Sequence, residues 1–285
     1  NGETEDAIAA FHQALLISEN RPGVTNGRAA LNVYDALTQS RGLDLRILKQ
    51  VAPDDEIAQS WLAWYLAGRG QLDPAMEVFR RLPRQVNPAT PELASQMLLT
   101  AQQSGRYAEA YEIWARLRSA SLLPESLPGE LIENGGFEEP DLADRFATLR
   151  DTGLGFGWVV ARHPEVVATR DDDRPYRGGK SMRVSFPRGM TVAYSGLSQL
   201  IRVEPGLSYR LMLHCRTRNL PPETPWLEVT GRSSTPGIEA EIKTRPRIEL
   251  PREAPEWQPI GIDFVVPPGV SAIHLTLQSP RYWVI

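Results

Sequence analysis

Cysteine is almost absent from the 285-residue sequence, in which Cys215 stands alone. A single thiol can form no internal disulfide and can contribute only one ligand to a multi-thiolate metal site. Cys215 lies in the apolar alternation SYRLMLHC, and we expect it to be a small buried core residue rather than a reactive thiol. One free thiol is compatible with a reducing compartment and with an exported bacterial protein, so cysteine usage assigns no compartment.

Long apolar runs are absent as well. No stretch approaches the roughly 18 to 20 uninterrupted apolar residues that a membrane-spanning helix requires, and we expect no membrane span in this chain. Neither sign of charge dominates, because 31 basic and 35 acidic residues give a net charge of −4. Such a balance predicts no nucleic-acid partner. The sequence shows no initiator Met and no basic-then-apolar leader, and we expect it to be a piece excised from a longer protein.

Recognisable catalytic motifs are missing too. The four histidines stand at no metal-ligand spacing, and no serine lies in a nucleophile elbow. The glycines of GLGFGW lead into Trp158 and a β pattern, so they do not form a phosphate-binding loop. We therefore predict a protein that is not an enzyme. A fragment of a glycoside-active enzyme is the alternative, and it would place two carboxylates about 5 to 10 Å apart across a cleft.

Proline usage and side-chain periodicity divide the chain into two parts. Only six of the 24 prolines precede residue 119, and helices exclude proline from their interiors. Apolar residues recur at helical spacing in AYEIWARL (110–117) and alternate in YRLMLHC (209–215). The connector SASLLPESLPG places the boundary near Pro124. We predict helical repeats over residues 1–123, a linker over 124–129 and an antiparallel β-sandwich over 130–285.

The helical part contains a repeat. GETEDAIAAF, GQLDPAMEVF and GRYAEAYEIW begin at Gly2, Gly70 and Gly105, which are 68 and 35 residues apart, and each has Ala at the sixth position and an aromatic residue at the tenth. A two-helix repeat has a period near 34 residues. We expect the glycine to adopt a positive φ after one helix, and the alanines, among them Ala7, to let the next helix pack closely.

These segments resemble the tetratricopeptide repeat family over about residues 1–120. The resemblance implies an α-solenoid whose concave face binds a protein or peptide partner.

The second part has landmarks in a characteristic order. They are ELIENGGFEEP (130–140), GFGW, GGKSMRV, SQLIRVEPGLSYRLMLHCR and EWQPIGIDFVVPPGVSAIHLTL. This order resembles the carbohydrate-binding-module superfamily, also described as galactose-binding-like, whose fold is an antiparallel β-sandwich of jelly-roll type. Independently, the turn-rich connectors without helical periodicity favour antiparallel strands. The family usually closes with a strand that carries an Asp pair, whereas this sequence closes with PRYWVI.

The same resemblance implies two kinds of site. A structural calcium ion would lie near Glu138 and the backbone of Gly178, Gly179 and Lys180. Calcium takes several oxygen ligands, so the missing Asp pair weakens this expectation, and Glu138 is otherwise a solvated turn residue. No other cofactor is expected.

Sugar recognition needs flat aromatic faces and polar groups that bond to hydroxyls. The candidate binding residues are Tyr176, Tyr194, Gln199, Arg202, Trp226, Tyr282 and Trp283, with His214 and Arg216 as further polar partners. Each of these residues has a structural alternative. Trp158 and Trp257 occupy positions at which the family usually packs its core.

Together the two resemblances imply a non-enzymatic scaffold that binds a protein with its repeats and a polysaccharide with its sandwich. Bacterial proteins with this pairing resemble envelope or exopolysaccharide assembly factors, which favours the periplasm or cell envelope over the cytoplasm. The alternative is a structural sandwich that clamps the repeats and binds no sugar. Exposure of Trp226, Tyr282 or Trp283 beside polar groups would favour ligand binding, and their burial would favour the clamp.

Overall fold

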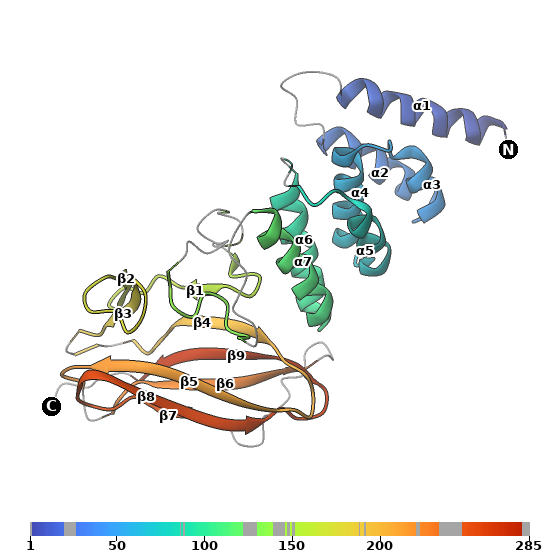
Figure 1. The fold of residues 1–285 in the computed structure, drawn as a ribbon. Coiled ribbons are helices and arrows are strands. Elements are labelled where there is room, and N and C mark those ends of the chain that lie inside the picture. Colours follow the sequence, from blue (N-terminus) through green and yellow to red (C-terminus); the bar gives the residue numbers. More distant parts are fainter. Residues whose placement is uncertain are drawn as a thin grey trace. The chain divides into compact units, whose positions relative to one another are not determined.

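The computed structural model describes residues 2–19, 27–85, 87, 89–121, 130–138, 146, 149, 152–187, 189–190, 192–220, 223–233 and 247–280. Over these residues the chain is first helical and then antiparallel β (Figure 1), which confirms the expected combination of helices and antiparallel strands. It forms two compact units, residues 1–102 with 112–123 and residues 103–111 with 124–285. The predicted linker, 124–129, lies outside the described residues.

Seven helices are described. They are α1 (Gly2–Glu19), α2 (Gly27–Arg41), α3 (Leu45–Val51), α4 (Glu56–Gly68), α5 (Leu72–Arg81), α6 (Thr90–Gln103) and α7 (Tyr107–Ala120). Aspartate side chains cap the N-termini of two of these helices. Asp44 accepts the backbone N–H of Arg46 at the start of α3, and Asp55 accepts those of Ile57 and Ala58 at the start of α4. Within the described part of the chain, no helix has the length and apolar character that crossing a membrane would need.

Two of the three repeat glycines, Gly70 and Gly105, have the backbone conformation that we expected. Gly70 and Gly105 have φ angles of 73° and 68°, in the left-handed region that residues with a Cβ atom rarely adopt. Ala75 and Ala110, five residues further on, are fully buried at 0% exposure. The spacing therefore identified the close-packed positions of α5 and α7.

The first repeat segment differs from the other two. Ala7 is exposed, so the expectation that it lets α1 pack closely on a neighbour is wrong. Helix α1 is held further along its length, where Leu15 is buried and Nδ1 of His12 lies 3.1 Å from the carbonyl oxygen of Val51. A shared sequence spacing thus does not give this segment the same packing.

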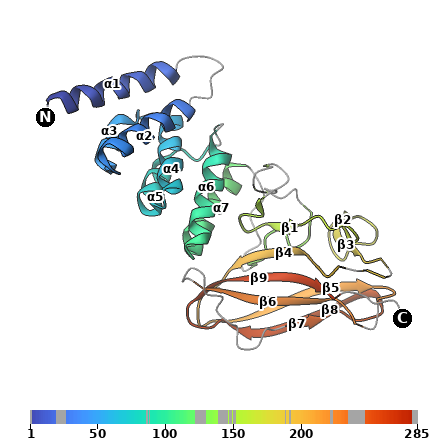
Figure 2. The ribbon, with the colours of Figure 1, turned by 180° about the vertical axis from the view of Figure 1, so that it is seen from behind.

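The second part of the chain contains nine described strands, seen from behind in Figure 2. They are β1 (Trp158–Val160), β2 (Val167–Asp171), β3 (Ser181–Ser185), β4 (Tyr194–Arg202), β5 (Ser208–Thr217), β6 (Trp226–Ser233), β7 (Arg247–Glu249), β8 (Ala254–Val265) and β9 (Val270–Ser279). Five form a sheet in the order β1-β4-β9-β6-β7, and β2–β3 and β5–β8 form two-stranded sheets. All pairings are antiparallel. The jelly-roll topology stays a prediction.

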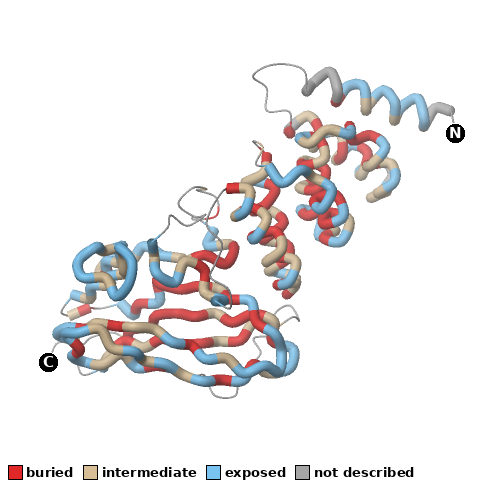
Figure 3. Tube along the Cα trace, viewed as in Figure 1, coloured by how far each residue is buried: buried red, intermediate tan, exposed pale blue. Residues whose placement is uncertain are grey.

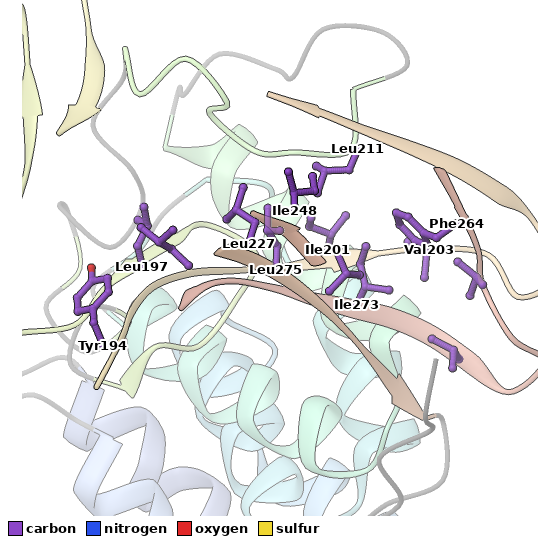
Figure 4. Packing of buried hydrophobic residues seen from close by; sticks show 14 of the residues in the cluster. Tyr194, Leu197, Ile201, Val203, Leu211, Leu227, Ile248, Phe264, Ile273 and Leu275 are labelled. Atoms are coloured by element: carbon purple, nitrogen blue, oxygen red, sulfur yellow. The ribbon is translucent and has the colours of Figure 1, made fainter. Parts of the chain in front are cut away.

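One apolar core joins the five-stranded sheet to the β5–β8 pair. Ile201, Leu227 and Leu275 of the larger sheet belong to the same buried cluster as Leu211 and Phe264 of the pair (Figure 4). Burial alternates along β5 as the sequence predicted, and Figure 3 shows the resulting change of colour along the strand. One face of the β5–β8 pair therefore contacts the core, and the other faces solvent.

Cys215 lies on the inner face of β5 and is 8% exposed. Burial raises the pKa of its thiol, which keeps it protonated near neutral pH. The expectation of a buried core cysteine is confirmed.

Candidate functional site

Three aromatic rings form a cluster on the outer face of the β5–β8 pair. Tyr176 stacks on His214 of β5, with ring centroids 3.6 Å apart and an angle of 12° between the planes. The ring of Trp257 in β8 lies 6.1 Å from that of Tyr176. Tyr176 is 40% exposed, and the other two rings are half-buried. We call these three residues the Tyr176 cluster.

The cluster depends on a loop between β2 and β3, residues 172–180, which we call the Tyr176 loop. Both views of the fold show the β2–β3 hairpin beside one end of the β5–β8 pair (Figures 1 and 2). Strand alternation provides the other two rings: His214 is on the opposite face of β5 from Leu213 and Cys215, which point inward. Residues far apart in sequence thus meet on one surface.

Strand β8 fixes the first half of the Tyr176 loop. Arg174 has a positive φ of 55°, a conformation that costs a residue with a side chain about 1 to 2 kcal/mol. The indole N–H of Trp257 donates to the carbonyl oxygen of Arg174 at 2.8 Å. The guanidinium of Arg174 donates to both carboxylate oxygens of Glu256 at 3.0 and 2.9 Å. These contacts stabilise the unusual backbone and hold Tyr176 in place.

Glu138 fixes the second half of the loop. Its carboxylate accepts the backbone N–H of Gly179 at 2.9 and 3.0 Å and that of Lys180 at 3.1 Å. The adjacent Gly178 has a φ of +68°, and a Cβ atom there would lie 2.1 Å from Oε1 of Glu138. Only glycine allows the carboxylate to approach so closely. The loop is therefore held at both ends before any ligand binds.

The residues expected to bind calcium do come together, but their geometry does not fit a cation. Gly179 and Lys180 present N–H donors to Glu138, whereas calcium needs several oxygen ligands. Among the residues that the structure describes, no group of three or more His, Cys, Asp or Glu side chains could hold a metal ion. Hydrogen bonds thus hold this turn in the described structure.

Two of the predicted sugar-binding residues belong to the interior. Tyr194 and Gln199 are 1% and 0% exposed, so neither offers a surface to a ligand, and this part of the sequence-based expectation needs correction. Burial raises the pKa of Tyr194 to about 12. The side-chain amide of Gln199 donates to the backbone carbonyl of Glu133 at 2.8 Å. Both residues lie on β4, which pairs with β1 on one side and β9 on the other.

Arg202 and Trp226 are on the larger sheet, apart from the β5–β8 pair. Arg202 is exposed at the end of β4, with its guanidinium carbon 5.6 Å from the ring centre of Tyr111. Trp226 is half-buried at the start of β6, and the guanidinium carbon of Arg247 lies 5.1 Å from its ring centre. Tyr282 and Trp283 lie outside the described residues.

Trp257 is the site residue that the family resemblance misassigned. It was expected in the core, but its ring lies beside Tyr176, and the guanidinium carbon of Arg216 is 5.6 Å from the ring centre. The signal was present in the sequence: Ile260, Ile262 and Phe264 pack inward, and a strand places odd and even positions on opposite faces.

No family model matches this chain, and no curated protein matches it. Two solved structures are similar to part of it at 14% sequence identity. The enzymatically active domain of tailspike protein 4 from bacteriophage CBA120 matches over 54% of this chain and 19% of its own length, with a TM-score of 0.39. A CBM4 structure matches over 53% of this chain and 92% of its own length, with a TM-score of 0.32. The chain thus spans about a fifth of the tailspike domain.

Proposed function

We propose that this chain is a non-enzymatic binding protein whose second unit binds a polysaccharide at the Tyr176 cluster. The observation that carries the proposal is the exposed ring of Tyr176, which is held parallel to His214 beside Trp257. A ring that is already fixed offers a planar surface to the apolar face of a sugar and loses little side-chain entropy on binding. Glu256, next to Trp257 in β8, has a side chain that is 75% exposed, and its carboxylate oxygens can accept hydrogen bonds from hydroxyls.

In the same proposal, the helical unit binds a protein segment, as the repeat resemblance implies. The chain would then connect a polysaccharide to a protein, a role suited to the periplasm or cell envelope. A β unit that only supports the helical unit is the alternative, and it would leave the Tyr176 cluster without a ligand.

The proposal can be tested by affinity electrophoresis of the full chain in gels that contain individual neutral or acidic polysaccharides. One aromatic face supports a dissociation constant of about 1 mM, or roughly −4 kcal/mol, and gels detect such weak binding through retardation. We expect Tyr176→Ala to weaken binding about 2- to 10-fold, since an aromatic contact contributes about 0.5 to 1.5 kcal/mol beyond the area it buries.

Leu207→Ala is the matched control, because it removes an apolar side chain that is 48% exposed at the opposite end of β5 from His214. It should bind like the parent chain. Absence of retardation across the whole panel would refute polysaccharide binding and support the purely structural role. Equal retardation of Tyr176→Ala and the parent would show that the polysaccharide binds outside the Tyr176 cluster.

A further inference from the structure

The positive charges around the Tyr176 cluster are unevenly compensated. Three of the cations there each lie close to a carboxylate, and the pairs are Arg174 with Glu256 at 2.9 Å, Lys180 with Asp172 at 3.5 Å and Arg216 with Asp173 at 3.7 Å. Arg177, which directly follows Tyr176, is exposed and has no carboxylate partner among the described residues. The Tyr176 loop therefore presents at its surface one guanidinium without an ion-pair partner in the described part of the chain, while the carboxylate of Glu138 accepts the N–H groups of Gly179 and Lys180.

The position of Arg177 relates this charge to the aromatic surface. Its guanidinium carbon lies 5.3 Å from the ring centre of Tyr176, within the range of a cation–π contact. The planar array of N–H groups of a guanidinium matches the two oxygens of a carboxylate or sulfate. A sugar ring that contacts the exposed part of Tyr176 would bring its substituents within reach of this group.

We infer that the polysaccharide bound at the Tyr176 cluster is acidic, and that Arg177 binds one of its carboxylate or sulfate groups. The inference rests on the proposed function and adds the chemical class of the ligand. A nucleic acid fits less well, because a polymer with a phosphate on every residue would bring further phosphates close to the carboxylates of Asp173 and Glu256. A polysaccharide with spaced acidic groups can approach the single free guanidinium and avoid the carboxylates.

The test compares matched polymers on the full chain, by affinity electrophoresis and isothermal titration calorimetry. Polygalacturonate is set against its methyl ester, and dextran sulfate against dextran, so that carboxylate and sulfate are examined separately. At 0.1 M salt we expect the acidic member of at least one pair to bind about 2- to 5-fold more tightly, the range for one exposed ion pair. At 1 M salt the difference should disappear, because the Debye length falls from about 10 Å to about 3 Å.

Two variants separate this inference from the proposed function. Arg177→Gln should remove the preference for the acidic polymer and leave binding of the neutral polymer unchanged, and Arg177→Lys should keep part of the preference. Arg162→Gln is the control: Arg162 is exposed just after β1, a strand of the other sheet, and has no carboxylate partner among the described residues. It should retain the full preference.

The inference is overturned if the acidic and neutral members of both pairs bind equally, or if Arg177→Gln keeps the preference. In that case the proposed function survives as long as Tyr176→Ala still weakens the binding. Oligothymidylate that binds as tightly as the acidic polysaccharide, with the same loss in Arg177→Gln, would show a general polyanion surface instead. Failure of every polymer to bind would overturn the inference and the proposed function together.

Discussion

Replacing Gly178 with alanine should weaken the Tyr176 loop through two separable effects. The first is the backbone: alanine at a φ of +68° costs about 1 to 2 kcal/mol. The second is contact with Glu138, whose Oε1 would lie 2.1 Å from the new Cβ atom. The flexible carboxylate can move away, but it then gives up the N–H groups of Gly179 and Lys180. Because water replaces these bonds, their loss costs only about 0.5 to 1.5 kcal/mol.

The sum predicts that Gly178→Ala destabilises the loop by roughly 1.5 to 3.5 kcal/mol. In a Glu138→Ala background only the backbone effect remains, so the same substitution should cost about 1 to 2 kcal/mol. The coupling energy of the double-mutant cycle is therefore expected to be about 1 kcal/mol. Gly206→Ala is the matched control: Gly206 has a φ of +82°, and a Cβ atom there would meet nothing within 4 Å.

Amide hydrogen exchange of Gly179 and Lys180 in the full chain measures the local opening free energy directly, which suits a protein with two units better than a global unfolding curve. Urea unfolding followed by near-UV circular dichroism provides a second measure. Additive effects within about 0.3 kcal/mol, or equal losses in Gly178→Ala and Gly206→Ala, would show that Glu138 does not hold this turn.

Three further outcomes concern other parts of the chain. Gly70→Ala should destabilise the helical unit by about 1 kcal/mol, because Gly70 has a φ of +73°. Gly68→Ala, in the last turn of α4, should instead stabilise this unit by about 0.5 kcal/mol. Urea unfolding measures both changes. Tyr194→Phe should be neutral or stabilising by up to about 1 kcal/mol, because the hydroxyl is buried without a hydrogen-bond partner in the described part of the chain. Burial raises the pKa of Tyr194 to about 12, so the parent should lose stability as the pH rises from about 10 to about 12, and the Phe variant should lose less. The hydrogen bond from Arg80 lowers the pKa of Glu112. This pair therefore stabilises the fold above about pH 4.5, by less than about 1 kcal/mol, and the stabilisation is lost as the pH falls further. Arg80→Gln should remove this pH dependence of the unfolding free energy, measured from about pH 3 to 6.

Helical spacing and strand alternation in the sequence predicted the parts of the fold in which buried residues recur at the same regular spacing. Gly70 and Gly105 were identifiable because helix ends of this kind need a positive φ, and few residues other than glycine supply it. Alternation likewise placed Cys215 in the core, and His214, the residue before it, lies on the outer face as the same alternation requires. Applied to β8 it would also have placed Trp257 outside, and only the family resemblance assigned that residue to the core.

The remaining site residues could not be read from periodicity. In β4 four consecutive residues, 196–199, are buried, so alternation does not separate an inner face from an outer one there. Tyr194 and Gln199 therefore resembled surface candidates while being interior. The stacking of Tyr176 on His214 depends on how a loop folds over a strand, and no local pattern encodes a contact between residues 38 positions apart.

Because the Tyr176 loop is held at both ends, its ligand preference can change through substitutions within the loop. Trp257 and Glu138 hold the loop through its backbone, at the carbonyl of Arg174 and the amides of Gly179 and Lys180. These contacts do not involve the side chains of residues 175–177. Those three side chains can therefore be changed while the backbone contacts that hold the loop are kept. Libraries randomised at these three positions should yield folded proteins with new ligand preferences, provided that Gly178 is retained.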